Sequence, residues 1–384
     1  MKIEKRVHDN ICDIFYGKGN EKYAGNLYES KTGKWLFDQR LLETIHDITK
    51  QKKENIPIGF KSYKLAIEYV KNQFRGKPQK KHPGALCVIN YKGGVGKTTV
   101  VTLLGVYLAT KGKRVLLVDT DPQCSLSLAL GEDPEKVSKT ELTIYNFMEP
   151  GAWMELKKKN LRDYTKPLES KHLPDNLHLL PGSFDTDELD LTICKASIDN
   201  EKCLSELFLY AKQLFIRLGT DYDYILVDCP PNKMYLTQAM LQACSVYLTV
   251  TIPDRISTYG MPRLIRWVRK IESVSDRPKT LGYILNAVNR SGGGMVNSQF
   301  SQSFNLKKSF RSLMTDEERK VIGHNPCIGI IPRLDSIPKF LGGQPWVLKD
   351  FSRSKSRQPS VGDCMTAIVN TVIKRIEEYH HAKD

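Results

Sequence analysis

Residues 92–99, KGGVGKTT, combine the residue types that bind a nucleoside triphosphate. Glycines let backbone amides converge on phosphate oxygens because no side chain stands in the way, and a following helix N-terminus adds a favourable dipole. Lys97 and Thr98 follow the glycines, so Lys97 is expected to bridge the β- and γ-phosphates and Thr98 to ligate Mg²⁺. The loop therefore predicts ATP binding and hydrolysis to ADP. Its predicted nucleotide contacts are Gly93, Gly94, Val95, Gly96, Lys97, Thr98 and Thr99.

Carboxylates follow two further apolar segments of the sequence. Residues 114–119 lead into Asp119 and Asp121, and residues 224–228 end at Asp228. In an open α/β sheet, ligands bind at the carboxyl ends of the strands. Asp121 is therefore expected to position the attacking water, and Asp228 to lie on the magnesium side of the site. For Asp119 two roles stay open, support of the Mg²⁺ shell or a helix cap.

The elements that must position these residues are short apolar strands that alternate with helices. Such runs, apolar throughout, are typical of strands buried on both faces of a mostly parallel sheet. The sequence therefore predicts a doubly wound α/β fold of the P-loop NTPase type. The expected strands are residues 85–90, 114–119, 224–228, 246–252, 281–285 and 328–331.

A small helical domain is expected before this region. Pro, Gly and charged residues at 77–84 indicate a linker, which separates residues 1–76 from an ATPase domain at 85–384. Apolar residues recur at helical spacing in three segments of the first part. The segments contain Ile3, Val7, Ile11 and Phe15, then Leu41, Ile45 and Ile48, then Tyr63, Ile67, Val70 and Phe74.

The composition indicates the kind of partner and the cellular compartment of the protein. The chain has 384 residues and a formal net charge of +15, which favours polyanionic partners. Its nine cysteines are scattered, as in reduced cytosolic proteins. The N-terminus lacks the apolar run of a secretory signal, and no stretch approaches the ~18 apolar residues of a membrane span. A cytoplasmic, nucleoid-associated protein without stable membrane association is expected.

Four motifs together give the second region a clear resemblance. KGGVGKTT at 92–99, DTDPQ at 119–123, DCPP at 228–231 and IPR at 331–333 resemble the ParA/Soj/MinD family of deviant Walker ATPases. The resemblance is greatest to the plasmid- and chromosome-partition branch, and it covers the chain from about residue 85 to the C-terminus. The family usually has a bulky apolar residue between the two aspartates, where this chain has Thr120.

The resemblance implies a homodimer and further site residues. In that family, the lysine at the Lys92 position reaches into the partner subunit and stabilises phosphate charge, so that ATP holds a sandwich dimer together. Asn286, Pro332 and Arg333 are implied as contacts to the adenine end of the nucleotide, although Asn286 fits a turn residue equally well. The implied catalytic set is Lys92, Lys97 and Asp121, and the implied metal set is Thr98, Asp119 and Asp228.

Basic clusters in the C-terminal half predict that the ATP-bound protein binds DNA. Such clusters neutralise phosphates without reading sequence. We expect an ATP-bound dimer that binds DNA non-specifically, and a ParB-like centromere-binding adaptor that stimulates hydrolysis and thereby segregates a plasmid or chromosome origin. The candidate DNA contacts are Arg263, Arg266, Arg269, Lys270, Arg290, Lys307, Lys308 and Arg311.

Other assignments compete with this one. The same ATPase could position a protein cargo, such as a carboxysome or a chemoreceptor array. A membrane role like that of MinD needs a bulky apolar tail, whereas the stripe from Val361 to Ile376 is typical of a packed last helix. Redox chemistry needs cysteines placed to hold a cluster, and that motif is missing. The N-terminal region fits a helix-turn-helix module or a dimerisation domain equally well.

Overall fold

The computed structural model divides the chain into two compact units, Met1–Lys80 and Lys81–Asp384. The structure describes residues 2–5, 11–16, 22–29, 35–37, 39, 41–43, 45, 59–60 and 66 of the first unit. Of the second unit it describes residues 84–149, 161–168, 173–199, 203–271, 278–291, 294–333 and 360–381. The division falls inside residues 77–84, and the role of that segment as a linker stays a prediction.

The first unit contains a five-stranded antiparallel sheet, in the order β1-β2-β3-β4-β5. The helix expected over Ile3 to Phe15 is therefore wrong in the described parts of that segment, because β1 and β2 are strands that pair with each other, while Val7 lies outside the described residues. A spacing of four residues fits one face of a strand as well as one face of a helix, since four is a multiple of two. The strands are β1 (Lys2–Lys5), β2 (Ile11–Tyr16), β3 (Lys22–Glu29), β4 (Trp35–Phe37) and β5 (Gly59–Phe60).

The other two predicted helical segments of this unit are described only in part. Around the second segment, residues 39, 41–43 and 45 are helical, and Leu41 and Ile45 are fully buried. In the third segment Ala66 is helical, while Tyr63, Ile67, Val70 and Phe74 lie outside the described residues. The helix-turn-helix and dimerisation hypotheses both stay predictions.

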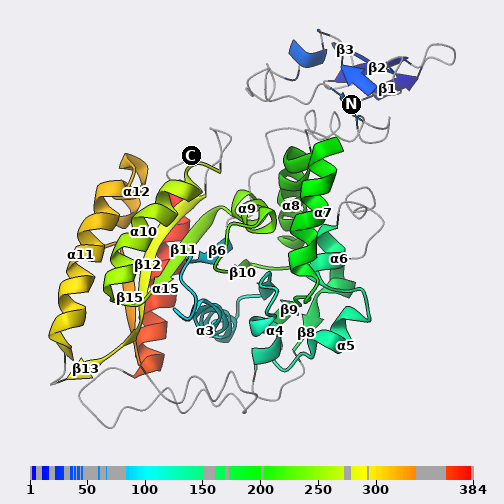
Figure 1. Cartoon of the computed structure of the whole chain (residues 1–384). Coiled ribbons are helices and arrows are strands. Elements are labelled where there is room, and N and C mark those ends of the chain that lie inside the picture. The colour runs from blue at the N-terminus through cyan, green and yellow to red at the C-terminus, as the bar shows by residue number, and fades with distance from the viewer. Residues whose placement is uncertain are drawn as a thin grey trace. The chain divides into compact units, whose positions relative to one another are not determined.

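The second unit is built on an eight-stranded sheet in the order β15-β12-β11-β6-β10-β7-β9-β8. Every neighbouring pair is parallel except β8 with β9 (Figure 1). The strands are β6 (Ala85–Ile89), β7 (Val115–Asp119), β8 (Lys166–Pro167), β9 (Leu177–Leu180), β10 (Tyr224–Asp228), β11 (Val246–Thr251), β12 (Lys279–Val288) and β15 (Cys327–Pro332). The six predicted strands are confirmed. β9 was missed, although its apolar residues between turn residues gave a short signal.

Helices cover both faces of this sheet, as the doubly wound prediction requires. On β6 the side chains alternate between two cores, with Leu86 and Val88 in one and Cys87 in the other. The first core contains α3 (Lys97–Thr110), α4 (Ser125–Ala129) and α15 (Val361–His381). The second contains α6 (Ile144–Met148), α7 (Thr186–Asp199), α8 (Cys203–Leu218), α9 (Tyr235–Ala243) and α10 (Arg255–Val268).

A third cluster packs α10 and α11 (Asn297–Leu313) against β12. Met261 and Ile265 of α10 meet Phe310 of α11 there, and all three are buried. The remaining elements are short. They are α5 (Pro134–Ser138), η3 (Leu161–Tyr164), α12 (Asp316–Ile322), β13 (Arg290–Ser291) and β14 (Gly294–Met295).

Candidate functional site

The glycine-rich loop joins β6 to α3 at the carboxyl edge of the sheet. Gly94 and Gly96 have left-handed backbones, with φ of 70° and 87°, which favours glycine at both positions. A Cβ at Gly96 would lie 2.1 Å from Nδ2 of Asn286, so a side chain would not fit there. Gly93 and Gly94 are exposed, and Lys97 begins the helix. The loop therefore has the form of a phosphate cradle ahead of a helix N-terminus.

Thr98 and Asp228 come together from different parts of the sequence. The Thr98 hydroxyl donates to Oδ2 of Asp228 at 2.6 Å, while the buried Oδ1 of Asp228 has no hydrogen-bond partner among the described residues. Burial, and secondly the nearby Asp119 carboxylate, raise the pKa of Asp228 to about 8. The hydrogen bond from Thr98 and the charge of Lys97 lower this pKa, but by less. A buried carboxylate oxygen without a partner beside a hydroxyl fits Mg²⁺, which is held by one or two carboxylates plus phosphate oxygens. Thr98 and Asp228 would hold that ion.

Asp119 is held by the protein itself. Its Oδ2 accepts from the backbone N–H and the hydroxyl of Ser127, at 2.8 and 2.7 Å, and its Oδ1 accepts from the Asp121 N–H at 3.2 Å. Burial raises its pKa to about 6, although the Ser127 hydrogen bonds act in the opposite direction. Of the two predicted roles, this geometry favours the structural one, in which Asp119 fixes the start of α4.

Asp121 lies at the same edge of the sheet and is only partly buried. Its Oδ1 accepts from the Gln123 N–H at 3.0 Å, and within the described residues its Oδ2 makes no hydrogen bond. One carboxylate oxygen is thereby fixed and the other is left to orient a water molecule. This position is compatible with the predicted catalytic role, which stays a prediction.

Lys92 has a partner within its own chain. Its ammonium group forms an ion pair with Asp254, and the two side chains are 26% and 34% exposed. Asp254 also caps α10, because its Oδ1 accepts from the Ser257 N–H at 2.7 Å. Burial raises the pKa of Asp254, but hydrogen bonds from Lys92 and Ser257 outweigh it and hold the pKa below its usual value.

Asn286 braces the phosphate-binding loop. Its buried amide donates to the Val95 carbonyl at 2.9 Å, across the gap between β12 and the loop. The next residue, Ala287, has a left-handed backbone with φ of 50°, a strained conformation for alanine. Pro332 is buried and Arg333 is exposed, and the Arg333 N–H donates to the Val288 carbonyl at 3.0 Å. The adenine role predicted for these residues stays a prediction.

The predicted DNA contacts fall into two groups. Arg263, Arg266 and Lys308 are exposed, and within the described residues they form no ion pair. Lys270 is exposed just beyond α10, whereas Lys307 and Arg311 of α11 are half-buried. Arg290 lies in β13, and its side chain is outside the described part of the structure.

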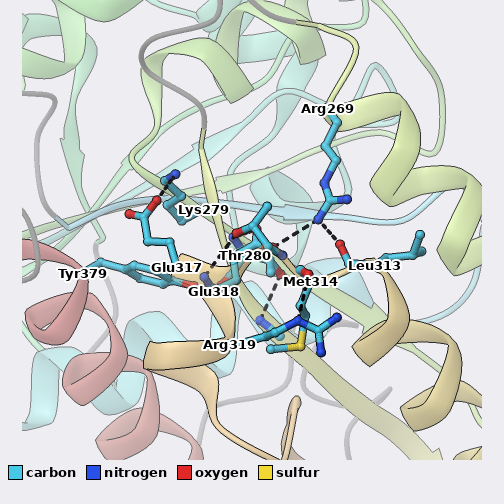
Figure 2. Close-up of polar contacts among 11 residues, drawn as sticks. Arg269, Lys279, Thr280, Leu313, Met314, Glu317, Glu318, Arg319 and Tyr379 are labelled. Carbon is cyan, nitrogen blue, oxygen red and sulfur yellow. Dashed lines mark hydrogen bonds and ion pairs between the residues drawn. The ribbon is translucent and has the colours of Figure 1, made fainter.

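Arg269 differs from its neighbours because its guanidinium group is bound inside the protein. It donates to the Leu313 carbonyl and pairs with Glu318 at 3.2 Å, where Glu318 is 4% exposed (Figure 2). Glu318 also accepts from the Thr280 and Thr315 N–H groups. Arg269 therefore joins α10 to α11 and α12, a structural role that spacing on the helix did not reveal.

Three residues at or beside the site were missed by sequence reasoning. Asp254 is a residue type that caps helix N-termini, which is a local signal. Its contact with Lys92 has no local signal, because the two residues are 162 positions apart. Asn90 accepts from the Lys92 N–H at 3.0 Å and donates to the Val250 carbonyl at 2.7 Å. Ser127 holds Asp119, as described above. Only the tertiary fold brings Asp254 to Lys92 and Asn90 to Val250.

The described residues bear on the membrane and redox alternatives. The apolar stripe of α15, from Val361 to Ile376, is buried, so its interpretation as a packed helix is confirmed. None of the described helices has the length and apolar character to cross a membrane. No group of three or more His, Cys, Asp or Glu side chains in the described part of the chain is placed to hold a metal ion.

Comparison with known proteins supplies the family. Residues 84–279 match the family model described as AAA domain. The chain is 31% identical over 199 residues to the chromosome-partitioning ATPase Soj of Treponema pallidum, a match that covers 52% of this chain and 69% of Soj. It is 29% identical over 198 residues to a Rhizobium rhizogenes relative named as replication protein A, covering 50% of this chain but only 47% of that relative.

Solved structures agree with these matches at the level of the fold. Apo McdA from Cyanothece superposes with a TM-score of 0.59 at 17% identity, covering 75% of this chain and 98% of McdA. The loop, the strand order and the family match lead to one assignment. The chain belongs to the AAA-domain family of P-loop ATPases that includes ParA and Soj.

Proposed function

We propose that the chain is a partition ATPase that segregates a plasmid or chromosome origin. ATP binding drives formation of a sandwich homodimer, and the dimer binds DNA without sequence preference. A ParB-like centromere-binding adaptor stimulates hydrolysis and resets the cycle. The protein would work in the cytoplasm, associated with the nucleoid.

One observation carries the ATPase part of the proposal. Thr98 contacts Asp228 beside the glycine-rich loop, in which Gly94 and Gly96 have left-handed backbones, and among the described residues one buried oxygen of Asp228 has no hydrogen-bond partner. In this site Lys97 would neutralise the β- and γ-phosphates, and Asp121 would orient the attacking water. ATP or ADP and Mg²⁺ are the proposed cofactors.

Dimerisation is supported by the position of Lys92. The residue precedes the glycines, so it lies outside the helix N-terminus that would hold the phosphates of its own subunit. Its intramolecular partner, Asp254, is itself 34% exposed, so that pair is open to competition. In the proposed dimer Lys92 would leave Asp254 and approach the phosphates bound by the partner subunit.

DNA binding is supported by the exposed cations of α10 and α11. Arg263, Arg266 and Lys308 project from two adjacent helices without carboxylate partners among the described residues. Contacts of this kind give affinity that falls steeply with salt and does not depend on sequence. The alternative cargo, a protein assembly positioned over the nucleoid, would use the same ATPase and the same surface. A membrane-associated role is less well supported, because α15 buries its apolar stripe.

The proposal is tested by Asp121→Asn in the full chain. The variant should lose most ATP hydrolysis while it retains ATP-dependent DNA binding, because the nucleotide contacts remain and the water loses its guide. Steady-state phosphate release and DNA anisotropy with ATP and ADP measure the two activities. Hydrolysis at the wild-type rate would reject Asp121 as the catalytic residue.

Asp187→Asn is the matched control for this experiment. Asp187 is an exposed carboxylate in the first turn of α7, outside the phosphate site. The Asp187→Asn variant should hydrolyse ATP and bind DNA as the wild type does. If the wild-type chain binds DNA equally with ATP, with ADP and without nucleotide, the proposed coupling between ATP and DNA is wrong.

A further inference from the structure

The paired helices α10 and α11 carry only positive charge. Arg255, Arg263 and Arg266 lie in α10, and Lys307, Lys308 and Arg311 lie in α11. Neither helix contains an aspartate or a glutamate. On an ordinary solvated helix, charges of both signs are interspersed. A surface of one sign over two adjacent helices therefore favours a polyanionic ligand.

Aromatic rings are exposed on the same two helices. Tyr259 of α10 is 71% exposed, and Phe300 and Phe304, one turn apart on α11, are 64% and 63% exposed. Single exposed apolar residues are ordinary, but a group of rings on adjacent helices marks an interaction site. Contacts to a duplex backbone involve phosphates and sugars, so duplex binding alone leaves these rings without a function.

A groove between the two helices is lined by one of the rings, Tyr259, and by two of the cations, Arg266 and Lys308. The helices run in the same direction side by side, because Thr258 bonds Gln302 at 3.0 Å near their N-termini and Arg269 reaches Leu313 near their C-termini (Figure 1). The groove between them has a volume of about 390 Å³. Its walls come from both helices: Thr258, Tyr259, Pro262 and Arg266 from α10, and Asn305, Lys308 and Ser309 from α11.

We propose that this α10–α11 surface, made of the groove and the exposed rings beside it, binds single-stranded DNA. The bases stack on Tyr259, Phe300 and Phe304, and the phosphates lie along Arg263, Arg266 and Lys308. A single strand offers one charge and one flat ring per nucleotide, which matches a surface that carries both groups. The three rings lie nearer the N-terminal ends of the two helices, and the three cations lie farther along them. Arg263 and Arg266 of α10, and Lys270 just beyond its end, recur about every turn, or ~5 Å, along the helix direction. The inference rests on the proposed function, because it takes DNA as the partner.

Three DNA probes separate base stacking from phosphate binding. They are a strand of 20 thymidines, an abasic strand with the same number of phosphates, and a 20-base-pair duplex. Binding of each to the full chain, with a slowly hydrolysed ATP analogue, is followed by fluorescence anisotropy. The ring variant is Phe300→Ala with Phe304→Ala. Its control is Leu191→Ala with Ile198→Ala, which removes apolar side chains that are 62% and 82% exposed on α7.

The ring variant should bind the thymidine strand at least about tenfold more weakly, because it loses two base-stacking contacts. Its affinity for the abasic strand and for the duplex should not change. Arg266→Ala should weaken binding to all three probes. The α7 control should bind every probe as the wild type does, and circular dichroism should be the same for all variants.

Several results would overturn the inference. One is equal loss of affinity for the thymidine and abasic strands, because the rings would then not contact bases. A second is weaker self-association of the ring variant with the ATP analogue, measured by sedimentation, which would assign the rings to a second copy of the chain. A third is ring-dependent binding of an acidic peptide but not of the thymidine strand. Failure of the wild type to bind the duplex would instead count against the proposed function, separately from the stacking result.

Discussion

Lys92 of the phosphate-binding loop forms an ion pair with Asp254, the residue that caps α10. The pair joins the segment after β6 to the segment after β11, two strands that are neighbours in the sheet. It gives Lys92 a resting position within its own subunit. Any role of Lys92 in a partner subunit must therefore begin with loss of this contact.

Replacing Asp254 by Asn should favour the ATP-bound dimer. Asparagine keeps the cap on α10 but removes the charge that holds Lys92. Because both side chains are partly exposed, the ATP analogue concentration needed for dimerisation should fall by only about two- to fivefold. Sedimentation velocity over an analogue titration measures this. Lys92→Ala should abolish the dimer, and a dimer that forms normally without Lys92 would show that the pair has no part in assembly.

The stability of the nucleotide-free protein should fall as pH increases from about 6 to about 8. Burial raises the pKa of Asp228 to about 8, whereas an unfolded aspartate titrates near 4. In this window the folded state keeps a proton that the unfolded state has released, so increasing pH favours unfolding, by up to about 1.4 kcal/mol per pH unit. Urea midpoints at pH 6, 7 and 8 measure the trend.

Asp228→Asn supplies the control for that measurement. The variant should lose the slope between pH 6 and 8, since asparagine does not titrate. Asp119, with a pKa of about 6, contributes mainly below this window. The same slope in wild type and variant would assign the titration to another group.

Two neighbouring arginines of the same basic cluster should respond differently to removal. Arg266→Ala should lower the magnitude of the slope of log affinity against log salt by about one, without a change in melting temperature. Arg269→Ala should destabilise the fold by about 2–3 kcal/mol, because it leaves the buried Glu318 carboxylate without its cation. DNA anisotropy across a salt series and thermal denaturation give the two readouts. If the Arg269→Ala variant folds stably and has a reduced salt slope, Arg269 contacts DNA after all.

Asn286→Ala tests whether this residue recognises adenine or braces the loop. Loss of its hydrogen bond to the Val95 carbonyl should weaken ATP and GTP binding alike, by about fivefold, because the loop serves the phosphates common to both. Competition against a fluorescent nucleotide analogue measures the two dissociation constants. Selective loss of ATP affinity would instead support the adenine contact.

The sequence alone determined the parts of the protein that depend on local pattern. Continuous apolar runs located six strands of the central sheet, and the glycine spacing located the loop before α3. The sequence also placed Asp228 at the end of one of these strands. These features are encoded within a few residues of one another, so local periodicity and turn chemistry are enough to find them.

Only the tertiary structure decided which partner each charged group takes. Lys92 meets Asp254, Asp119 is held by Ser127, and Arg269 is bound by Glu318, because folding brings together side chains from separate segments. At the N-terminus, the four-residue spacing of Ile3, Val7, Ile11 and Phe15 suited both helix and strand, and pairing between β1 and β2 determined the outcome. Helical spacing placed Arg266 and Arg269 on one basic cluster, but burial of Glu318 beside only one of them gave them different roles.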